Sequence, residues 1–101
     1  MDFSKNRLSI AEAKEIDMVG YLSRLGFEPA KIRGKAYWYH SPLHDEKTPS
    51  FVVNRDRNLW NDFGLGKGGS IIDFGMHFHR CSIPEFLQIL SGDISHIPTI
   101  A

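Results

Sequence analysis

The fold is decided by two stretches of the chain, SPLHDEKTPSF at residues 41–51 and DFGLGKGG at residues 62–69. Around them lie three segments whose residue types are typical of β-strands: 36–40, 50–54 and 58–63. The polar turn at 55–57 joins the last two segments, so they are predicted to form a hairpin, with 36–40 as a third strand. The glycines of 64–69 predict a flexible connector after this hairpin.

A helical region is predicted before the strands. Apolar residues recur at helical spacing over residues 10–25, after a capping box that begins at Ser9, and Gly26 is typical of a helix end. Asp17 is a second possible N-cap inside this region, so the region is either one helix or two short ones.

Two more helices are predicted after the strands, starting at Ser70 and at Ser82, with Gly92 ending the second. The fold class is therefore α+β: a small antiparallel sheet of about three strands flanked by about three to four helices. Residues 1–92 are expected to form this domain, and residues 93–101 are expected to be a linker or tail.

Composition limits the function classes. The chain has 101 residues, 42% of them hydrophobic, which suits one small globular domain, and its short apolar runs exclude a membrane span. One cysteine, Cys81, excludes an internal disulfide and is expected to be a core residue. The formal net charge is zero, but residues 31–67 carry seven basic and four acidic side chains. Such a surface can support weak contacts with phosphate groups.

The two stretches resemble the zinc-ribbon domain, of the CHC2 type, that begins bacterial DNA primases. The resemblance rests on PxHxEKTPSF at 42–51, FGxGxGG at 63–69 and the pair Asp73-Phe74, and it covers roughly residues 17–90. In that family the first stretch opens with Cys-x-x-His and the second with Cys-x-x-Cys. The corresponding positions in this chain are Ser41, His44, Asp62 and Leu65. The spacing of a zinc finger is kept, but three of its four ligands are replaced.

No zinc cofactor is therefore expected, although the resemblance implies one, because structural zinc requires four ligands that are normally thiolates and imidazoles. We expect Leu65 to pack where a thiolate would point, and Ser41 to bond to a neighbouring amide or to His44. His44 is expected to be a hydrogen-bonding partner inside the former site. Packing of the aromatic residues is expected to stabilise the ribbon in place of the metal; these are Tyr37, Trp38, Tyr39, Phe51, Trp60 and Phe63.

The resemblance implies a non-catalytic, DNA-binding module of a primase-like protein that contacts single-stranded template during primer synthesis in the cytoplasm. In this family a Toprim-type domain performs nucleotidyl transfer, and this chain is too short to include one. The expected partners are single-stranded DNA and either a downstream Toprim domain or a replication helicase, with no membrane. Degenerate fingers of this kind also resemble those in primase-like proteins of mobile elements.

Six residues are candidates for contact with nucleic acid. Basic side chains would meet phosphates and aromatic rings would stack on bases; the candidates are Lys47, Arg55, Arg57, Lys67, Trp60 and Tyr37. Each also has a structural interpretation: a solvated charge for the basic residues, and burial for Trp60 and the nearby Trp38. An alternative function, favoured by the neutral net charge, is a metal-free protein-interaction or spacer domain that has lost DNA binding.

Overall fold

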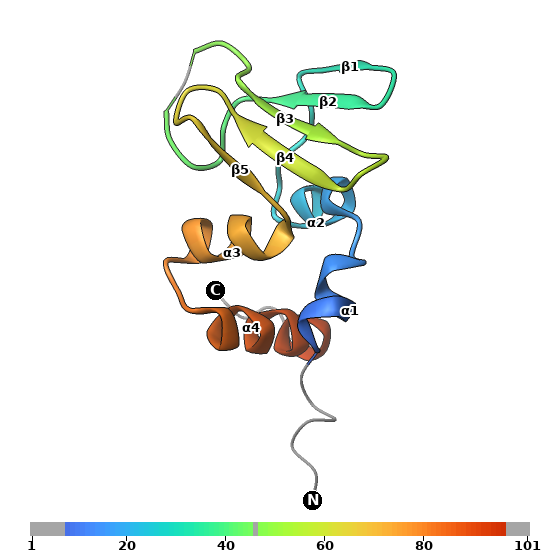
Figure 1. The fold of residues 1–101 in the computed structure, drawn as a ribbon, viewed down its shortest axis with the longest axis vertical. Coiled ribbons are helices and arrows are strands. Elements are labelled where there is room, and N and C mark those ends of the chain that lie inside the picture. The colour runs from blue at the N-terminus through green and yellow to red at the C-terminus, as the bar shows by residue number, and fades with distance from the viewer. Residues whose placement is uncertain (1–7, 46, 97–101) are drawn as a thin grey trace, which may run out of the picture.

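The structure, a computed structural model, describes residues 8–45 and 47–96, and the side chains among them up to residue 92 (Figure 1). Two short helices precede a five-stranded sheet, and two longer helices follow it. The elements are α1 (Ile10–Lys14), α2 (Met18–Arg24), β1 (Lys31–Arg33), β2 (Ala36–Tyr39), β3 (Phe51–Asn54), β4 (Leu59–Asp62), β5 (Lys67–Gly69), α3 (Ile71–His79) and α4 (Ile83–His96).

The sheet is a meander in which each strand pairs antiparallel with the next, in the order β1-β2-β3-β4-β5. The three predicted strands are confirmed as β2, β3 and β4, but the predicted strand number of about three is wrong. The segment 67–69, expected to belong to a flexible connector, forms β5 and pairs with β4. Gly68 is required there, because a Cβ atom at this position would lie 2.6 Å from the carbonyl oxygen of Trp60.

The predicted helical region at 10–25 is two helices, which settles the alternative that the sequence left open. The Ser9 capping box is confirmed, with Ser9 Oγ accepting from the Glu12 amide at 3.1 Å. Asp17 caps α2 by accepting from the Gly20 amide at 3.1 Å. The chain between the two helices can therefore change direction beneath the sheet.

The helices after the sheet also begin where the sequence predicts, at capping boxes on Ser70 and Ser82. The predicted end at Gly92 is wrong, because α4 continues to His96. A Cβ atom at Gly92 would have no neighbour within 4 Å, so packing does not require a glycine at this position. Residues 97–101 of the predicted tail lie outside the described residues, and the division of the chain at residue 92 stays a prediction.

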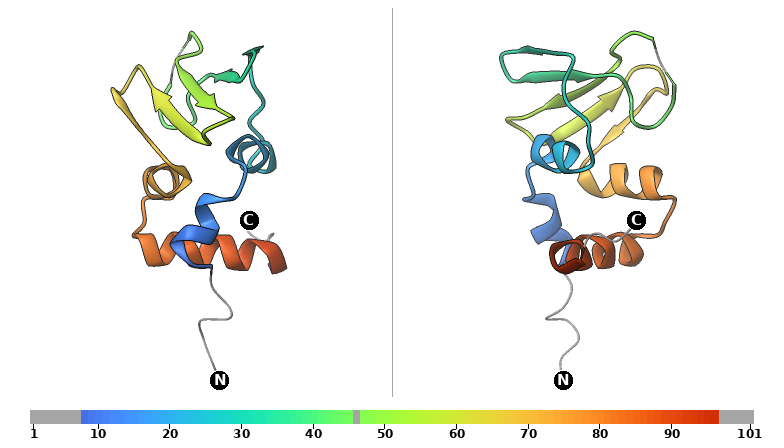
Figure 2. Two further views of the ribbon diagram at one scale, coloured as in Figure 1. Left: turned by 45° about the vertical axis from the view of Figure 1, so that its right-hand side comes forward. Right: turned by 180° about the vertical axis from the view of Figure 1, so that it is seen from behind.

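Helices α2 and α3 lie against one face of the sheet, and α4 lies farther away (Figures 1 and 2). An aromatic cluster fills the space beneath the sheet: Phe51 stacks on Trp60 with ring centroids 5.3 Å apart, and Phe74 of α3 meets both rings edge-on. Helix α4 approaches α3 so closely that a Cβ atom at Gly75 would lie 2.2 Å from the Phe86 ring. None of the described helices is long and apolar enough to cross a membrane.

Candidate nucleic-acid interface

The sheet has one covered face and one face turned away from the helices, here called the outer face. Strand register places two rows of residues on the outer face, because directly opposed residues of antiparallel strands point to the same side. The rows are Lys31, Trp38, Val52, Asn61 and Gly68, and beside them Arg33, Ala36, Asn54 and Leu59. These nine residues include two basic and no acidic side chains, so the outer face is polar and mildly positive.

An aromatic pair stands on the outer face. Trp38 stacks on Phe63 with ring centroids 6.1 Å apart and ring planes inclined by 24°, and the ammonium group of Lys31 lies 5.5 Å from the Trp38 ring. Phe63 is 63% exposed, the highest fraction among the exposed large apolar residues of the described chain. An exposed aromatic ring beside a cation is the arrangement that stacks on a nucleobase and holds its phosphate.

A shallow depression of about 320 Å³ opens at the hairpin end of the outer face. Leu59, which is 41% exposed, and Asn61 contribute to its wall, and Arg57 stands at its rim beside the β3–β4 turn. The outer face therefore combines apolar surface, amide groups and cations.

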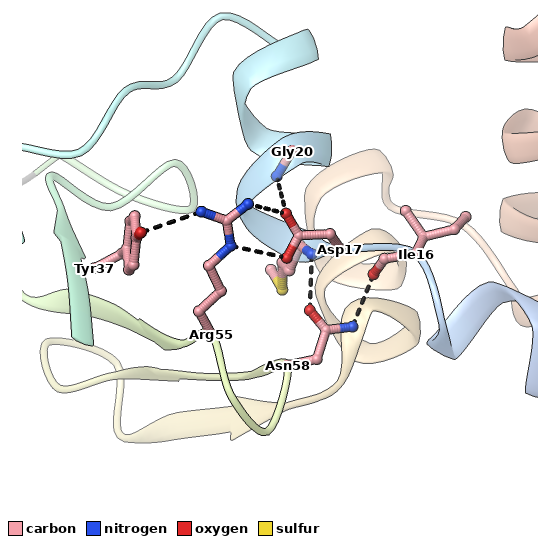
Figure 3. Close-up of polar contacts among 7 residues, drawn as sticks. Ile16, Asp17, Gly20, Tyr37, Arg55 and Asn58 are labelled. Atoms are coloured by element: carbon pink, nitrogen blue, oxygen red, sulfur yellow. Dashed lines mark hydrogen bonds and ion pairs between the residues drawn. The ribbon is translucent and has the colours of Figure 1, made fainter. Parts of the chain in front are cut away.

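Arg55, which the sequence suggests as a phosphate contact, is engaged within the protein (Figure 3). Its guanidinium donates to both carboxylate oxygens of Asp17, at 2.7 and 3.2 Å, and to the hydroxyl of Tyr37 at 3.1 Å. These hydrogen bonds raise the pKa of Arg55 still further above its usual high value. Arg55 also covers the Tyr37 ring, 5.2 Å from its centroid, so Tyr37 does not present that face to a base.

Asn58 completes this region, which we call the hairpin junction: Asp17, Tyr37, Arg55 and Asn58. The Asn58 side chain accepts from the Met18 amide at 2.8 Å and donates to the Ile16 carbonyl oxygen at 2.7 Å (Figure 3). It also donates to the carbonyl oxygen of Lys14 at 3.0 Å. Its backbone is left-handed, with φ of 60°, a conformation that asparagine tolerates better than most residues. The hairpin junction thus fastens the β3–β4 turn to the chain between α1 and α2.

The other predicted contact residues lie in different places. Trp60 is 3% exposed beneath the sheet, where its indole donates to the Ser70 carbonyl oxygen at 2.8 Å, so burial is confirmed and base stacking on this ring is excluded. Arg57, Lys47 and Lys67 are exposed, but they do not form one group. Arg57 borders the outer face, Lys47 lies in the loop before β3, and Lys67 is opposite Asp62 at the β5 edge.

The four former ligand positions do come together, and we call Ser41, His44, Asp62 and Leu65 the Asp62 cluster. Asp62 is fully buried at its centre. Its carboxylate accepts from Ser41 Oγ at 2.6 Å, from His44 Nε2 at 3.0 Å and from the Leu65 amide at 3.0 Å. Ser41 Oγ in turn accepts from the Leu43 amide at 2.9 Å, which confirms the expected bond to a neighbouring amide.

Burial alone would raise the pKa of Asp62, but the hydrogen bonds from Ser41, His44 and Leu65 outweigh it and lower the pKa. The expected inward packing of Leu65 is wrong: the residue is 40% exposed, and its backbone amide is the group that turns toward Asp62. The hydroxyl of Ser41 is bonded to the carboxylate rather than to an imidazole, so the cluster has no activated nucleophile.

The Asp62 cluster does not fit a structural zinc ion. Leu65 supplies a backbone N–H donor and Ser41 supplies a hydroxyl. Only His44 and Asp62 carry groups that bind zinc well. The described residues contain no group of three or more His, Cys, Asp or Glu side chains that could hold a metal ion.

The residues that sequence reasoning missed are Trp38, Phe63 and Lys31. Trp38 was expected in the core, yet strand register places it on the outer face opposite Val52. The sequence of β2 carries no local signal for this, because Tyr37, Trp38 and Tyr39 are all aromatic. The burial of Tyr39 in the structure places the residue before it on the other face.

Comparisons with known proteins agree with this architecture. The family model described as the CHC2 zinc finger matches residues 9–98. The DNA primase of Enterococcus faecalis is 33% identical over 82 residues, which is 81% of this chain and 12% of that protein. The DNA primase of Buchnera aphidicola is 41% identical over 63 residues, which is 62% of this chain and 11% of that protein.

A solved structure of the Aquifex aeolicus primase, containing its zinc-binding and RNA polymerase domains, matches with a TM-score of 0.66 and 26% identity. That match covers all of this chain and 24% of the Aquifex chain. The chain spans about an eighth or less of the length of the curated relatives described above. The matched part is the non-catalytic zinc-binding domain of primases, and the catalytic domain is not in this chain. The chain belongs to the CHC2 zinc-finger family of DNA primases.

Proposed function

We propose that this primase-like module binds single-stranded DNA through the outer face of its sheet, in a cytoplasmic replication protein of primase type. The observation that carries the proposal is the stacked pair of half-buried Trp38 and exposed Phe63, with Lys31 beside it. Stacking on such rings is tolerant of base sequence, because every base has a flat aromatic surface. The membership of the chain in a primase family supports DNA as the ligand.

In this proposal, bases stack on the outer aromatic pair and the phosphates run along the cations beside it. Lys31 and Arg33 lie on the edge strand β1, and Arg57 lies across the sheet at the depression. The module holds and orients template, and a Toprim-type domain elsewhere in the full protein joins the nucleotides. A replication helicase is a further partner that this role would place nearby. The altered ligand positions also fit a primase-like protein of a mobile element.

The outer face predicts weak, salt-dependent binding. Three cations that each neutralise one phosphate give a slope of about −2 for the logarithm of the association constant against that of salt concentration. Stacking contributes roughly 1–3 kcal/mol for each base. We therefore expect measurable affinity only at low ionic strength for the isolated chain.

Fluorescence anisotropy with a labelled oligothymidylate of about ten nucleotides tests the proposal at low salt. Trp38→Ala and Phe63→Ala are each expected to weaken binding by about 5-fold to 100-fold. Lys31→Ala should weaken binding less, and it should reduce the steepness of the salt dependence by the contribution of about one phosphate contact. Lys14→Ala, on helix α1 and outside the nine outer-face residues, is the matched control and should bind as the unchanged protein does.

Two outcomes contradict the proposal. One is the absence of binding at low salt by the chain in its full-length protein. The other is that Trp38→Ala and Phe63→Ala bind as tightly as the unchanged protein while Arg57→Ala or Lys47→Ala binds more weakly. This result would place the interface on the loops that the sequence favours.

The alternative is a protein-interaction or spacer domain, favoured by the exposed apolar residues Leu59 and Phe63 on this side of the molecule. Apolar docking and base stacking respond differently to Phe63→Leu, which keeps apolar area and removes the aromatic ring. A DNA-binding face loses affinity for the oligonucleotide in this variant. A protein-docking face keeps its partner and is insensitive to salt.

A further inference from the structure

The Asp62 cluster lies where relatives in this family carry a zinc site, and it is built as a closed hydrogen-bonded unit. Its carboxylate is fully buried and receives an O–H and two N–H groups at 2.6–3.0 Å. The donors come from both sides of the former metal site: Ser41 and His44 from the loop after β2, and Leu65 from the turn after β4. The carboxylate thus joins the same two segments that a metal ion would join.

His44 adds a charge to this connection when its imidazole is protonated. Its Nε2 lies 3.0 Å from Asp62 Oδ1 and its Nδ1 lies 3.1 Å from the backbone oxygen of Asp45. Both neighbours are acceptors, so both hydrogen bonds form only when each ring nitrogen carries a proton. The imidazolium then balances the charge of the buried carboxylate, and an ion pair replaces a cation held by thiolates.

Groups around the site donate protons where a zinc site would offer lone pairs. The Leu65 amide, the Ser41 hydroxyl and the His44 N–H all point their hydrogens at the carboxylate, so a cation at that place would meet positive ends of dipoles. The backbone adds two more ties, with the Gly66 amide donating to the Asp62 carbonyl oxygen at 2.8 Å and the Phe63 amide donating to that of Ser50 at 2.9 Å. These bonds fix the turn in the position that presents the Leu65 amide.

We propose that the carboxylate of Asp62 has taken over the structural role of zinc in this chain, so that the ribbon folds and stays folded without a metal ion. The backbone still brings the four positions together, so restoring ligands at three of them is expected to restore a zinc site. The proposal concerns folding and metal content, and it holds whether or not the outer face binds DNA.

The test compares three proteins by zinc analysis and thermal melting, each with and without EDTA. The unchanged protein should contain far less than one zinc per chain and melt at the same temperature in EDTA. Asp62→Asn should melt lower by roughly 5–15 °C, whereas Asp45→Asn, at an exposed position in the same loop, should melt as the unchanged protein does. The triple variant Ser41→Cys, Asp62→Cys and Leu65→Cys, with His44 kept, should bind about one zinc per chain and become sensitive to EDTA.

Several results would overturn the proposal: stoichiometric zinc in the unchanged protein, a melting temperature for Asp62→Asn equal to that of Asp45→Asn, or a folded triple variant that binds no zinc. If Asp62→Asn fails to fold in the presence and absence of zinc, Ser41→Ala replaces it, and its melting temperature must fall without any dependence on EDTA. Rescue of either variant by added zinc would instead show that a metal supports the native fold.

Discussion

Strand β4 is held by polar groups at both of its ends, and the two ends differ in their exposure to water. At its start the hairpin junction pairs Arg55 with Asp17, whose side chains are 45% and 42% exposed. At its end the Asp62 cluster encloses a carboxylate that is fully buried. Water and salt screen the first pair more strongly than the second, in which the side chain of Asp62 is 0% exposed and that of His44 is 23% exposed. Contacts of similar length are therefore expected to differ widely in what they contribute to stability.

Lowering the pH should produce the largest loss of stability, and it should act on the Asp62 cluster at the end of β4. The pKa of Asp62 is lower in the folded chain than its ordinary value of 3.8, so at low pH the unfolded state binds more protons than the folded state. The contribution of Asp62 is complete above the ordinary pKa and is lost as the pH falls through the lowered one. Urea unfolding between pH 7 and pH 3 should show this loss of stability.

The unfolding series needs a comparison, because other carboxylates also titrate in this range. Asp62→Asn should flatten the dependence of stability on pH, and Asp45→Asn should leave it as steep as in the unchanged protein. An equally steep dependence in Asp62→Asn would assign the acid sensitivity to other groups.

The next largest loss of stability is expected from Asn58, a half-buried residue of the hairpin junction. Asn58→Gly keeps the left-handed backbone and removes three hydrogen bonds, so the free energy of unfolding should fall by about 2–4 kcal/mol. Asn58→Ala should lose about 1 kcal/mol more, because alanine is strained at this φ. Chemical denaturation measures both. A loss below about 0.5 kcal/mol for Asn58→Gly would contradict the assignment.

Ser41→Ala should have an intermediate effect at the opposite end of β4. It removes the 2.6 Å hydrogen bond to the Asp62 carboxylate and leaves the other two, so we expect a loss of about 1.5–3 kcal/mol. Ser23→Ala is the matched control, because Ser23 makes a 2.9 Å bond to a carboxylate, that of Glu28, on the exposed surface. Equal losses in the two serine variants would mean that burial of the Asp62 cluster adds nothing.

Arg55→Gln should have the smallest effect of the four, because water screens the ion pair that it breaks. The melting temperature should fall by less than about 3 °C at low salt. The difference in melting temperature from the unchanged protein should shrink further in 0.5 M salt, where the Debye length is on the order of 4 Å. Lys35→Gln, which breaks the more exposed pair with Asp56, should change it even less. A salt-independent loss for Arg55→Gln would show that its hydrogen bond to Tyr37 matters more than its charge.

The sequence predicts the elements that have a strong local signal. Strands β2, β3 and β4 carry aromatic and β-branched residues, and the helix starts carry capping boxes, so short-range chemistry suffices for them. Strand β1 has only three residues, all exposed, and β5 is Lys-Gly-Gly, a composition more typical of turns. Strands β1 and β5 form because β2 and β4 each have an edge with which they can pair, and the local sequence does not show this.

The candidate site follows the same division. The convergence of Ser41, His44 and Asp62 was expected from their spacing and from the family resemblance, whereas the turning of the Leu65 amide depends on backbone geometry. Arg55 could not be matched with Asp17 from sequence, because 38 residues separate them. Trp38 and Trp60 are both strand tryptophans, and only the register of the whole sheet shows that one faces outward.

The chemistry of the Asp62 cluster also bears on oxidative damage. A site of the family pattern exposes three cysteine thiolates to peroxides, which oxidise the sulfur and release the metal. The Asp62 cluster contains oxygen and nitrogen donors only. The thiol of Cys81 is half-buried and bonded to the Gly75 carbonyl oxygen, and burial raises its pKa, so little of the reactive thiolate is present. This module should therefore keep its shape through oxidant exposure and zinc starvation that would unfold a metal-bearing ribbon.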